Sequence, residues 1–256
     1  MKEYDVVIVG AGIAGLTAAI YAVRAGKSVM VLESQVEGGQ IINTINIENW
    51  PGDMRVSGVE LIRKVKAQVE ELGAEVDYVN VEKIVKTQGG FEIFGDMDEK
   101  FKAKSVILAM GTNPRKLSDA MMKDAGKRPV SYCATCDGAL YKGKNVVVVG
   151  HGNTAKHEVK YLEGICAKVY NIHHDEKIPE DADAVFVAIG RLPATECAKG
   201  LVDIDDRNYI VAGEDCHTSA TGVFVAGDCR TKALRQLVTA AADGAVAATE
   251  AVNYLA

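Results

Sequence analysis

The chain has 256 residues, of which 48% are apolar and 25% charged, which is ordinary for a globular protein of one or two modest domains. A net charge of −6 argues against general nucleic-acid binding, and no apolar run approaches the ~18–20 residues of a membrane-spanning helix. The N-terminus enters a strand pattern without a signal peptide, so the six cysteines favour a cytoplasmic protein over a secreted disulfide framework.

The first part of the chain predicts a strand, a tight turn, a helix and a second strand. The strand Val6–Val9 runs into Gly10-Ala-Gly-Ile-Ala-Gly15, and the apolar-periodic stretch Ile13–Ala25 follows. The next strand, Ser28–Leu32, ends on Glu33. This order indicates a βαβ unit of the dinucleotide-binding type.

Each motif residue has a physical task in such a unit. Gly10 allows the tight turn, Gly12 lets the backbone approach a pyrophosphate, and Gly15 lets helix and strand pack closely. The helix N-terminus faces the phosphates, and Glu33, 23 residues after Gly10, accepts hydrogen bonds from ribose hydroxyls. A glycine turn without a ligand is the alternative, but the placement of Glu33 argues against it.

The rest of the chain adds strands and then repeats the first pattern. Strands are expected at Asn80–Val85, Phe91–Phe94 and Ser105–Leu108, with a hairpin turn at Gly89-Gly90. The repeat comprises the strand Lys144–Val149, the turn Gly150-His-Gly-Asn-Thr-Ala155, the helix Asn153–Leu162 and the strands Lys168–Ile172 and Val185–Ile189. The chain closes with a strand in Gly222–Asp228 and a helix in Arg235–Leu255.

We therefore expect an α/β fold with two Rossmann-like, three-layer ββα domains, the second inserted in the first. The first domain would comprise residues 1–112 and 191–256, and the shortened insert residues 113–190.

Two cysteines, Cys133 and Cys136, stand just before the second glycine turn and are followed by Asp137. A Cys-x-x-Cys pair brings two sulfurs close enough to bridge and lowers the thiolate pKa of one of them. A zinc site is the alternative, but no second Cys-x-x-Cys exists, and His173, His174 and Cys166 look too few and too scattered. No metal site is expected. The remaining thiols, Cys166, Cys197, Cys216 and Cys229, show no pairing pattern.

The chain resembles the low-molecular-weight thioredoxin reductase family of flavoproteins. The matching blocks are spread over nearly the whole chain: Gly10–Ala19, Gly38-Gly-Gln-Ile41, Glu48-Asn-Trp-Pro-Gly52, Cys133–Gly138, Phe186–Gly190, Thr221–Asp228 and Arg235–Ala242. The resemblance implies FAD as cofactor, thioredoxin as substrate and a homodimer. It also implies that Cys136 is the thiol nearer the flavin, that Cys133 attacks the substrate disulfide, and that Asp137 protonates the leaving thiolate.

The same resemblance implies a set of cofactor-binding residues. Gln40 and Asn49 would contact the flavin, Asp228 would hold the ribityl chain, and Arg235 with Gln236 would lie against the isoalloxazine. The full expected set is Gly10, Gly12, Ile13, Ala14, Gly15, Glu33, Ser34, Gly39, Gln40, Asn49, Gly111, Gly227, Asp228, Arg235, Gln236 and Leu237.

The electron donor is predicted from what the insert lacks. A site for the 2′-phosphate of NADPH needs arginines beyond its second strand, but His174 and Asp175 occupy the positions of the family's arginine pair. A short insert without these arginines resembles the ferredoxin-dependent, pyridine-nucleotide-independent thioredoxin reductases of clostridia. Ferredoxin is therefore the expected donor. NADPH, NADH and a non-catalytic redox sensor remain alternatives.

An acidic ferredoxin would need a basic docking surface. The richest basic run is Arg115, Lys116, Lys123, Lys127 and Arg128, although a solvated charged surface explains the same run more simply.

Overall fold

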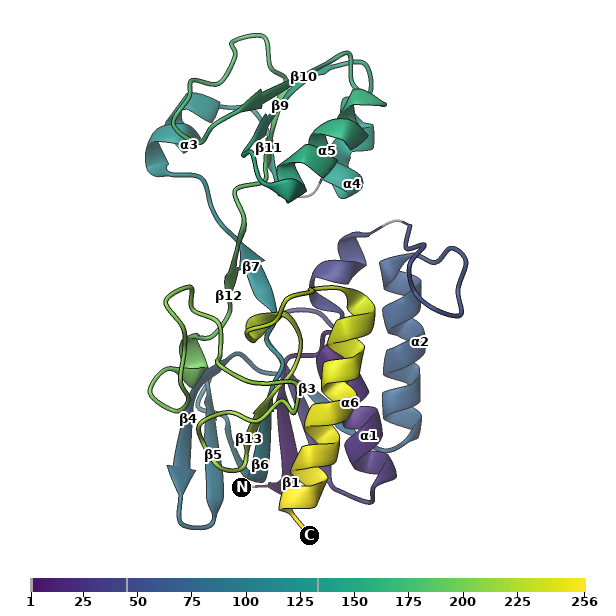
Figure 1. Cartoon of the computed structure of the whole chain (residues 1–256), viewed down its shortest axis with the longest axis vertical. Helices are drawn as coiled ribbons and strands as arrows, with labels where there is room; N and C mark the ends of the chain where they lie inside the picture. Colours follow the sequence, from purple (N-terminus) through teal and green to yellow (C-terminus); the bar gives the residue numbers. More distant parts are fainter. Residues whose placement is uncertain (1, 45, 133) are drawn as a thin grey trace. The chain divides into compact units, whose positions relative to one another are not determined.

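The computed structural model describes residues 2–44, 46–132 and 134–256, and the chain forms two compact units (Figure 1). The first unit contains the described residues of Met1–Ile42, Asn46–Thr112 and Pro193–Ala256. The second contains Asn113–Leu192 and the described residues of Asn43–Ile45. The chain passes between the units through two short paired strands, β7 (Thr112–Pro114) and β12 (Arg191–Pro193).

A seven-stranded sheet forms the centre of the first unit. Its parallel part has the order β3-β2-β1-β6, with β13 also parallel to β6. An antiparallel hairpin continues from β6 through β5 to β4. The strands are β1 (Glu3–Val9), β2 (Val29–Glu33), β3 (Glu75–Tyr78), β4 (Val81–Thr87), β5 (Gly90–Gly95), β6 (Lys100–Leu108) and β13 (Val223–Val225).

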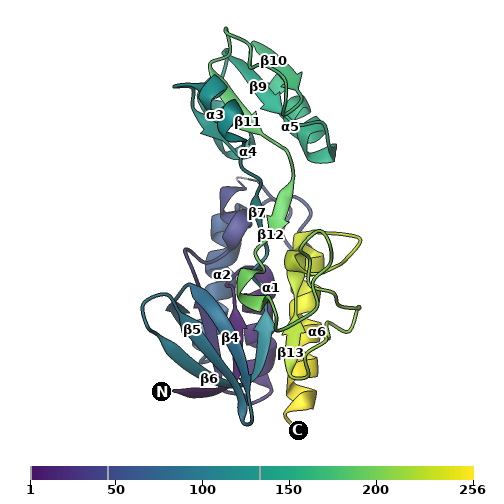
Figure 2. The ribbon, with the colours of Figure 1, turned by 90° about the vertical axis from the view of Figure 1, so that its left-hand side faces the viewer.

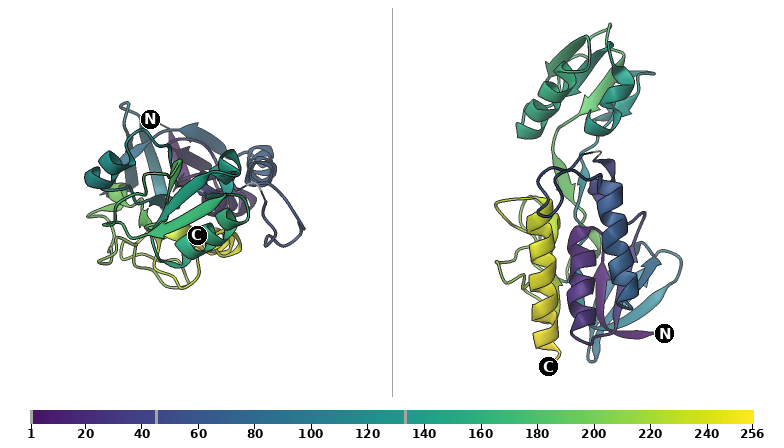
Figure 3. Two further views of the ribbon diagram at one scale, coloured as in Figure 1. Left: turned by 90° about the horizontal axis from the view of Figure 1, so that it is seen from above. Right: turned by 90° about the vertical axis from the view of Figure 1, so that its right-hand side faces the viewer.

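Three helices stand side by side on one face of the parallel strands, α1 (Ile13–Arg24), α2 (Gly58–Glu71) and α6 (Leu237–Tyr254) (Figure 3). Strand residues alternate between faces, so Val6 and Ile8 pack toward these helices while Val7 and Val9 pack toward the β4–β5 layer. The result is a three-layer ββα arrangement.

The helices α1 and α6 approach closely because small residues face each other. A Cβ on Gly244 would collide with the backbone oxygen of Ala14. On α6, the alanines Ala247, Ala248 and Ala251 are fully buried in the same interface. Alanine here gives good helix propensity with a minimal side-chain volume. The α2 helix begins more conventionally, with the Ser57 hydroxyl accepting from the Glu60 N–H.

The second unit is a four-stranded parallel sheet in the order β10-β9-β11-β8 (Figure 2). Its strands are β8 (Val130–Ser131), β9 (Asn145–Val149), β10 (Lys168–Ile172) and β11 (Ala184–Val187). The helices α4 (Ala134–Asp137) and α5 (Asn153–Glu163) pack on one face, and α3 (Asp119–Ala125) packs on the other. Short 3-10 helices complete both units: η1 (Gly39–Asn43), η2 (Gly138–Tyr141), η3 (Glu196–Ala198) and η4 (Gly227–Cys229).

The expected α/β fold with two Rossmann-like units is confirmed, and a few local predictions were wrong. The hairpin turn is Gln88-Gly89 rather than Gly89-Gly90, because Thr87 pairs with Gly90 and so draws the second glycine into β5. The helices α2 and α3 were not predicted, because charged residues fill most of their exposed faces. Among the described residues, no helix is long and apolar enough to cross a membrane.

Candidate functional site

The turn between β1 and α1 is shaped by three glycines. Gly10 has a φ of +104°, and a Cβ there would strike the carbonyl oxygen of Ala109. A Cβ on Gly15 would strike the carbonyl oxygen of Gly10, so helix and strand can pack at this distance only without side chains. Gly12 is the N-cap of α1, and no described atom lies within 4 Å of a Cβ built there. The turn is therefore open where a pyrophosphate would meet the helix N-terminus, at Ile13 and Ala14.

Glu33 is held beside this turn by backbone donors. It is the last residue of β2 and is buried. Its Oε2 accepts from the Ala11 N–H at 2.8 Å, and its Oε1 accepts from the Gln35 N–H at 3.0 Å. The Ser34 hydroxyl lies 3.5 Å from Oε1. Because each carboxylate oxygen has two lone pairs, Glu33 retains acceptor capacity for a ribose hydroxyl.

Two amide side chains link distant segments of the first unit. Gln40, in η1 next to Gly39, donates from Nε2 to the carbonyl oxygen of Thr112 at 2.9 Å and to its hydroxyl at 2.7 Å. Asn49 donates to Oε1 of Gln236 at 3.1 Å, across 187 positions of sequence. Gly111, with φ of +64°, precedes Thr112, and a Cβ there would meet no described atom within 4 Å. The structure thus brings Asn49 together with Gln236, and Gln40 together with the segment after β6.

The segment from Gly227 to Leu237 carries the expected flavin-binding residues near the end of the chain and forms one wall of the expected cofactor site. Asp228 lies in η4, with one carboxyl oxygen shielded from solvent. Arg235 donates to the carbonyl oxygens of Asp228 at 3.3 Å and Arg230 at 3.0 Å. Its guanidinium also lies 4.0 Å over the ring centre of Tyr209. These contacts fix the guanidinium plane before any ligand binds.

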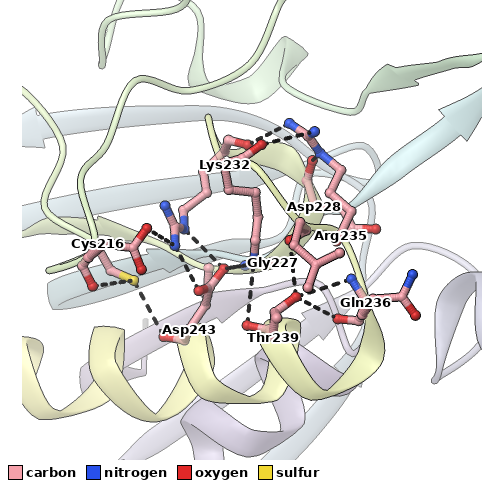
Figure 4. A network of polar contacts seen from close by, with 12 residues as sticks. Cys216, Gly227, Asp228, Lys232, Arg235, Gln236, Thr239 and Asp243 are labelled. Atoms are coloured by element: carbon pink, nitrogen blue, oxygen red, sulfur yellow. Dashed lines mark hydrogen bonds and ion pairs between the residues drawn. The ribbon is translucent and has the colours of Figure 1, made fainter. Parts of the chain in front are cut away.

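A buried carboxylate, Asp243 of α6, holds this wall in place (Figure 4). Asp243 accepts from the Gly227 N–H at 2.9 Å, from Arg230 at 3.0 and 2.8 Å, and from Lys232 at 2.6 Å. Burial alone would raise the pKa of Asp243, but its hydrogen bonds to Arg230 and Lys232 outweigh burial and keep that pKa below its ordinary value.

None of Asp243, Arg230 and Lys232 was singled out from the sequence. The available signal was one acidic residue on the alanine-rich face of the last helix, where a carboxylate is out of place unless it has partners.

The residues of the first unit fit FAD. The glycine turn leaves open space at Gly12 for a pyrophosphate, Glu33 is placed for a ribose, and side chains from both ends of the chain form the walls. Gly39 and Gly111 both have positive φ and open space where a side chain would otherwise stand.

The dithiol segment belongs to the second unit. Cys133 lies outside the described residues, and the backbone of Cys136 belongs to α4. Asp137 at the end of α4 accepts a 2.6 Å hydrogen bond from the Ser131 hydroxyl. Gly138 lets this segment pack on α5, since a Cβ there would lie 2.9 Å from Leu162 Cδ2.

The four other cysteines are free thiols, as expected. Burial raises the pKa of Cys197 and Cys216 to about 11 and that of Cys229 to about 12, and it also raises the pKa of Cys166. Since the thiolate is the reactive form, these cysteines are poor nucleophiles at neutral pH.

Glu158 of α5 is an unusual carboxyl in the same unit. It lies between Ala155 and Leu162 on the helix, and these two residues share a buried cluster with Ala134 of α4. Its Oε2 is shielded from solvent, and no described residue hydrogen-bonds to that oxygen. Burial raises the pKa of Glu158 from its ordinary 4.5 to about 7, although the charge of Arg191 counteracts part of the effect.

The second glycine turn, between β9 and α5, repeats the geometry of the first. Gly150 has a φ of +131°, and a Cβ there would strike the carbonyl oxygen of Ala188. Gly152 is the N-cap of α5 with no described atom near an added Cβ. Beyond β10, His173, His174 and Asp175 are all exposed.

The Asp243 network yields a first prediction. Asp243→Ala leaves two buried cations without their carboxylate and is expected to cost about 3–5 kcal/mol of unfolding free energy. It should also weaken FAD retention, because the Gly227 N–H loses its acceptor. Urea unfolding and flavin release on dialysis measure the two effects.

Glu214→Gln is the control, since Glu214 lies 3.7 Å from the same Arg230 but is 96% exposed. Its loss should change the free energy of unfolding by less than about 1 kcal/mol. Equal losses in both variants would contradict the role of Asp243.

Glu158 yields a pH prediction. The folded protein holds its proton up to about pH 7, whereas the unfolded chain releases it near 4.5, so ionisation favours unfolding. The stability of the wild type relative to Glu158→Gln should therefore fall as pH rises from 4.5 to about 7, and then level off. Urea midpoints at several pH values measure this difference. Glu163→Gln, at an exposed position of the same helix, should show no such trend. Parallel curves for the wild type and Glu158→Gln would show that Glu158 ionises normally.

Comparisons with known proteins agree with this geometry. The family model of the pyridine nucleotide-disulphide oxidoreductases matches residues 4–181 and 167–244. A thioredoxin reductase of Bacillus subtilis is 33% identical, over 99% of this chain and 95% of the relative. The 302 aligned positions exceed the 256 residues of this chain, so the relative contains segments that this chain lacks.

Solved structures give the same result. A thioredoxin reductase of Lactococcus lactis matches with a TM-score of 0.87 and 32% identity, over 98% of this chain and 99% of that one. A ferredoxin-flavin thioredoxin reductase of Clostridium acetobutylicum matches with a TM-score of 0.64 and 31% identity, over 100% of this chain and 99% of that one. The chain therefore belongs to the pyridine nucleotide-disulphide oxidoreductase family, in which it is an FAD-binding oxidoreductase related to the thioredoxin reductases.

Proposed function

We propose that the protein is a thioredoxin-disulfide reductase that passes electrons from reduced ferredoxin, through FAD and the Cys133–Cys136 pair, to thioredoxin. The observation that supports the donor is the segment after β10, where His174 and Asp175 stand in place of the family's arginine pair and Glu176 adds a second carboxylate. Two carboxylates there repel a 2′-phosphate, which instead needs bidentate guanidinium contacts.

Two of the three arginines of the second unit, Arg128 and Arg191, have partners within that unit. Arg128 donates to the carbonyl oxygens of Ala182, Ala125 and Glu180, so its guanidinium holds the backbone of its own unit together. Arg191 interacts with the charge of Glu158. Lys177, near the end of β10, lies 3.6 Å from Glu180.

The hydrogen bonds of Arg128 remove this residue from the expected basic docking surface. Arg128 uses its donors internally, which leaves the exposed Arg115, Lys116, Lys123 and Lys127 as the basic residues for an acidic donor. The Clostridium acetobutylicum relative is a ferredoxin-flavin thioredoxin reductase, and its match over the whole chain supports this donor class.

In the first unit, the proposed cofactor contacts are those that the sequence and the family resemblance predict, and the geometry of the glycine turn supports them. The glycine turn with Ile13 and Ala14 binds the pyrophosphate, and Glu33 with Ser34 binds the adenosine ribose. On the flavin side, the groups are Gly39, Gln40, Asn49, Gly111, Gly227, Asp228, Arg235, Gln236 and Leu237. When bound, FAD supplies the conversion between one-electron donors and the two-electron reduction of a disulfide.

The chain's own residues then carry out thiol–disulfide exchange. The Cys133 thiolate attacks one sulfur of the thioredoxin disulfide, the substrate S–S bond breaks, and a mixed disulfide forms. Cys136 next attacks the Cys133 sulfur, which closes the Cys133–Cys136 bridge and releases the second substrate thiol. Asp137 donates a proton to a leaving thiolate, and its bond from the Ser131 hydroxyl keeps its carboxyl oriented. The cytoplasmic location and the homodimer stay predictions.

Use of a nicotinamide nucleotide is the second candidate. The turn Gly150–Gly152 retains the open geometry of the first glycine turn, and the family whose model matches this chain is that of the pyridine nucleotide-disulphide oxidoreductases. A helix N-terminus alone contributes only about 0.3–1 kcal/mol at an exposed site, however, which is far below what nucleotide binding requires.

The donor is tested by anaerobic stopped-flow absorbance. Photoreduced ferredoxin should bleach the flavin band rapidly, whereas excess NADPH and excess NADH should leave it oxidised on the same timescale. Dithionite provides the control that the flavin is reducible. Rapid bleaching by NADPH would reject the ferredoxin assignment and favour the second candidate.

The dithiol is tested in a coupled assay with reduced ferredoxin and thioredoxin. Cys136→Ser should abolish thioredoxin reduction, because one thiol cannot re-form the intramolecular bridge that releases product. Cys166→Ser is the matched control and should keep full activity, since burial raises the pKa of that thiol. Absence of turnover in the wild type at full flavin occupancy would instead favour a redox sensor.

A further inference from the structure

A cluster of metal-binding side chains lies where β10 ends. Three consecutive residues, His173, His174 and Asp175, have ligand atoms that all lie within 4.8 Å of one another. The chain turns tightly here, with the Glu176 N–H donating to the carbonyl oxygen of His173 at 3.2 Å. Ligands at about 2.0–2.2 Å from a tetrahedral ion stand roughly 3.4 Å apart, so small side-chain rotations would close the cluster on a cation. From the sequence alone, the two histidines looked too scattered for such a site.

A third histidine, His151 of the glycine turn after β9, packs against this cluster. Its ring centre lies 3.6 Å from that of His173, with the planes tilted by 52°. The strands β9 and β10 are parallel neighbours, with Val149 opposite Ile172, so the residues that follow them meet at one edge of the sheet. Neutral imidazole is the form that binds a metal ion.

A backbone contact sets the tautomer and the orientation of the His151 ring. Its Nδ1 lies 2.7 Å from the carbonyl oxygen of Gly150, and a carbonyl oxygen only accepts, so Nδ1 carries the hydrogen. In the neutral ring, Nε2 then carries the free lone pair. The same carbonyl oxygen accepts from Asn171 Nδ2 at 2.6 Å, which holds it in place. A histidine that donates one ring N–H to a backbone carbonyl is the usual arrangement around protein-bound metal ions.

The local charges favour a cation over an anion. Asp175 and Glu176 are exposed carboxylates, and the neighbouring Lys177 lies 3.6 Å from Glu180. The N-terminus of α5 would favour an anion, but that effect is only about 0.3–1 kcal/mol. Two full negative charges outweigh this partial positive charge.

We propose that His173, His174 and Asp175, with His151 stacked against His173, form a binding site for a divalent transition-metal ion such as Zn²⁺. Two imidazoles and one carboxylate, with a position left for water, are a donor set that suits Zn²⁺ and its spectroscopic substitute Co²⁺. The ion occupies the sheet edge where a dinucleotide fold otherwise places its nucleotide, and His151, from the turn before α5, packs against the ligand His173. This site is independent of the proposed reductase activity.

Calorimetric titration with Zn²⁺ tests the site on the tag-free, FAD-bound protein. The Cys133→Ser/Cys136→Ser variant serves as the background, so that the dithiol does not compete for the ion. One equivalent of Zn²⁺ should bind, and His173→Ala and His174→Ala should each weaken binding by at least about tenfold. His174→Ala leaves the ring contact between His151 and His173 intact and so separates ligand loss from local disorder. His157→Ala, at an exposed position on α5, is the matched control and should bind as the background does.

Cobalt absorption gives the second readout. Co²⁺ in the proposed site should show ligand-field bands without the intense thiolate charge-transfer band that cysteine ligation produces. Unchanged Zn²⁺ affinity in both His173→Ala and His174→Ala would overturn the proposal, as would an equal loss in His157→Ala. Absence of saturable binding up to millimolar Zn²⁺ would overturn it too. None of these results depends on turnover, so they leave the reductase proposal untouched.

Discussion

The carboxylate of Asp243 is the interaction on which the first unit most depends. It gathers Arg230, Lys232 and the Gly227 N–H around one buried charge. A buried ion network of this kind adds little net stability compared with an apolar core, but losing its central charge would leave two cations uncompensated. The network therefore acts mainly by fixing the positions of these residues. The last helix is tied to the η4 turn, and that turn carries Asp228 and supports Arg235, whose guanidinium is already held before a cofactor binds.

Much of this arrangement could be predicted from the sequence. Glycine spacing is informative because it reports backbone conformations and close contacts that other residues cannot adopt, and Gly10 and Gly15 have the roles assigned to them. The strands were equally visible, since Lys168–Ile172 matched its prediction to the residue. The Asp243 network could not be predicted, because its partners are defined by where α6 docks rather than by a local pattern. The helices α2 and α3 were missed for a related reason, since helix formation there depends on packing of a few apolar residues.

The second unit combines the glycine turn of a dinucleotide fold with residues after β10 that do not suit a phosphate. Gly150 and Gly152 retain the geometry of a phosphate-binding turn, while histidines and carboxylates follow β10. Close packing preserves such glycines, because Gly150 cannot accept a side chain against Ala188 whether or not a nucleotide binds. The exposed residues after β10 have no such constraint. The residues at this edge suit a cation better than a phosphate, which accords with the proposal that electrons arrive from a protein donor.

An anaerobic reductive titration of the purified FAD-bound protein tests the central claim most directly. A flavin that communicates with a redox-active cystine should accept about four electrons per FAD, two for the flavin and two for the disulfide. Cys136→Ser should accept only about two, because the bridge can no longer form. Uptake of two electrons by the wild type, with both thiols of the pair present, would show that no disulfide takes part and would contradict the account.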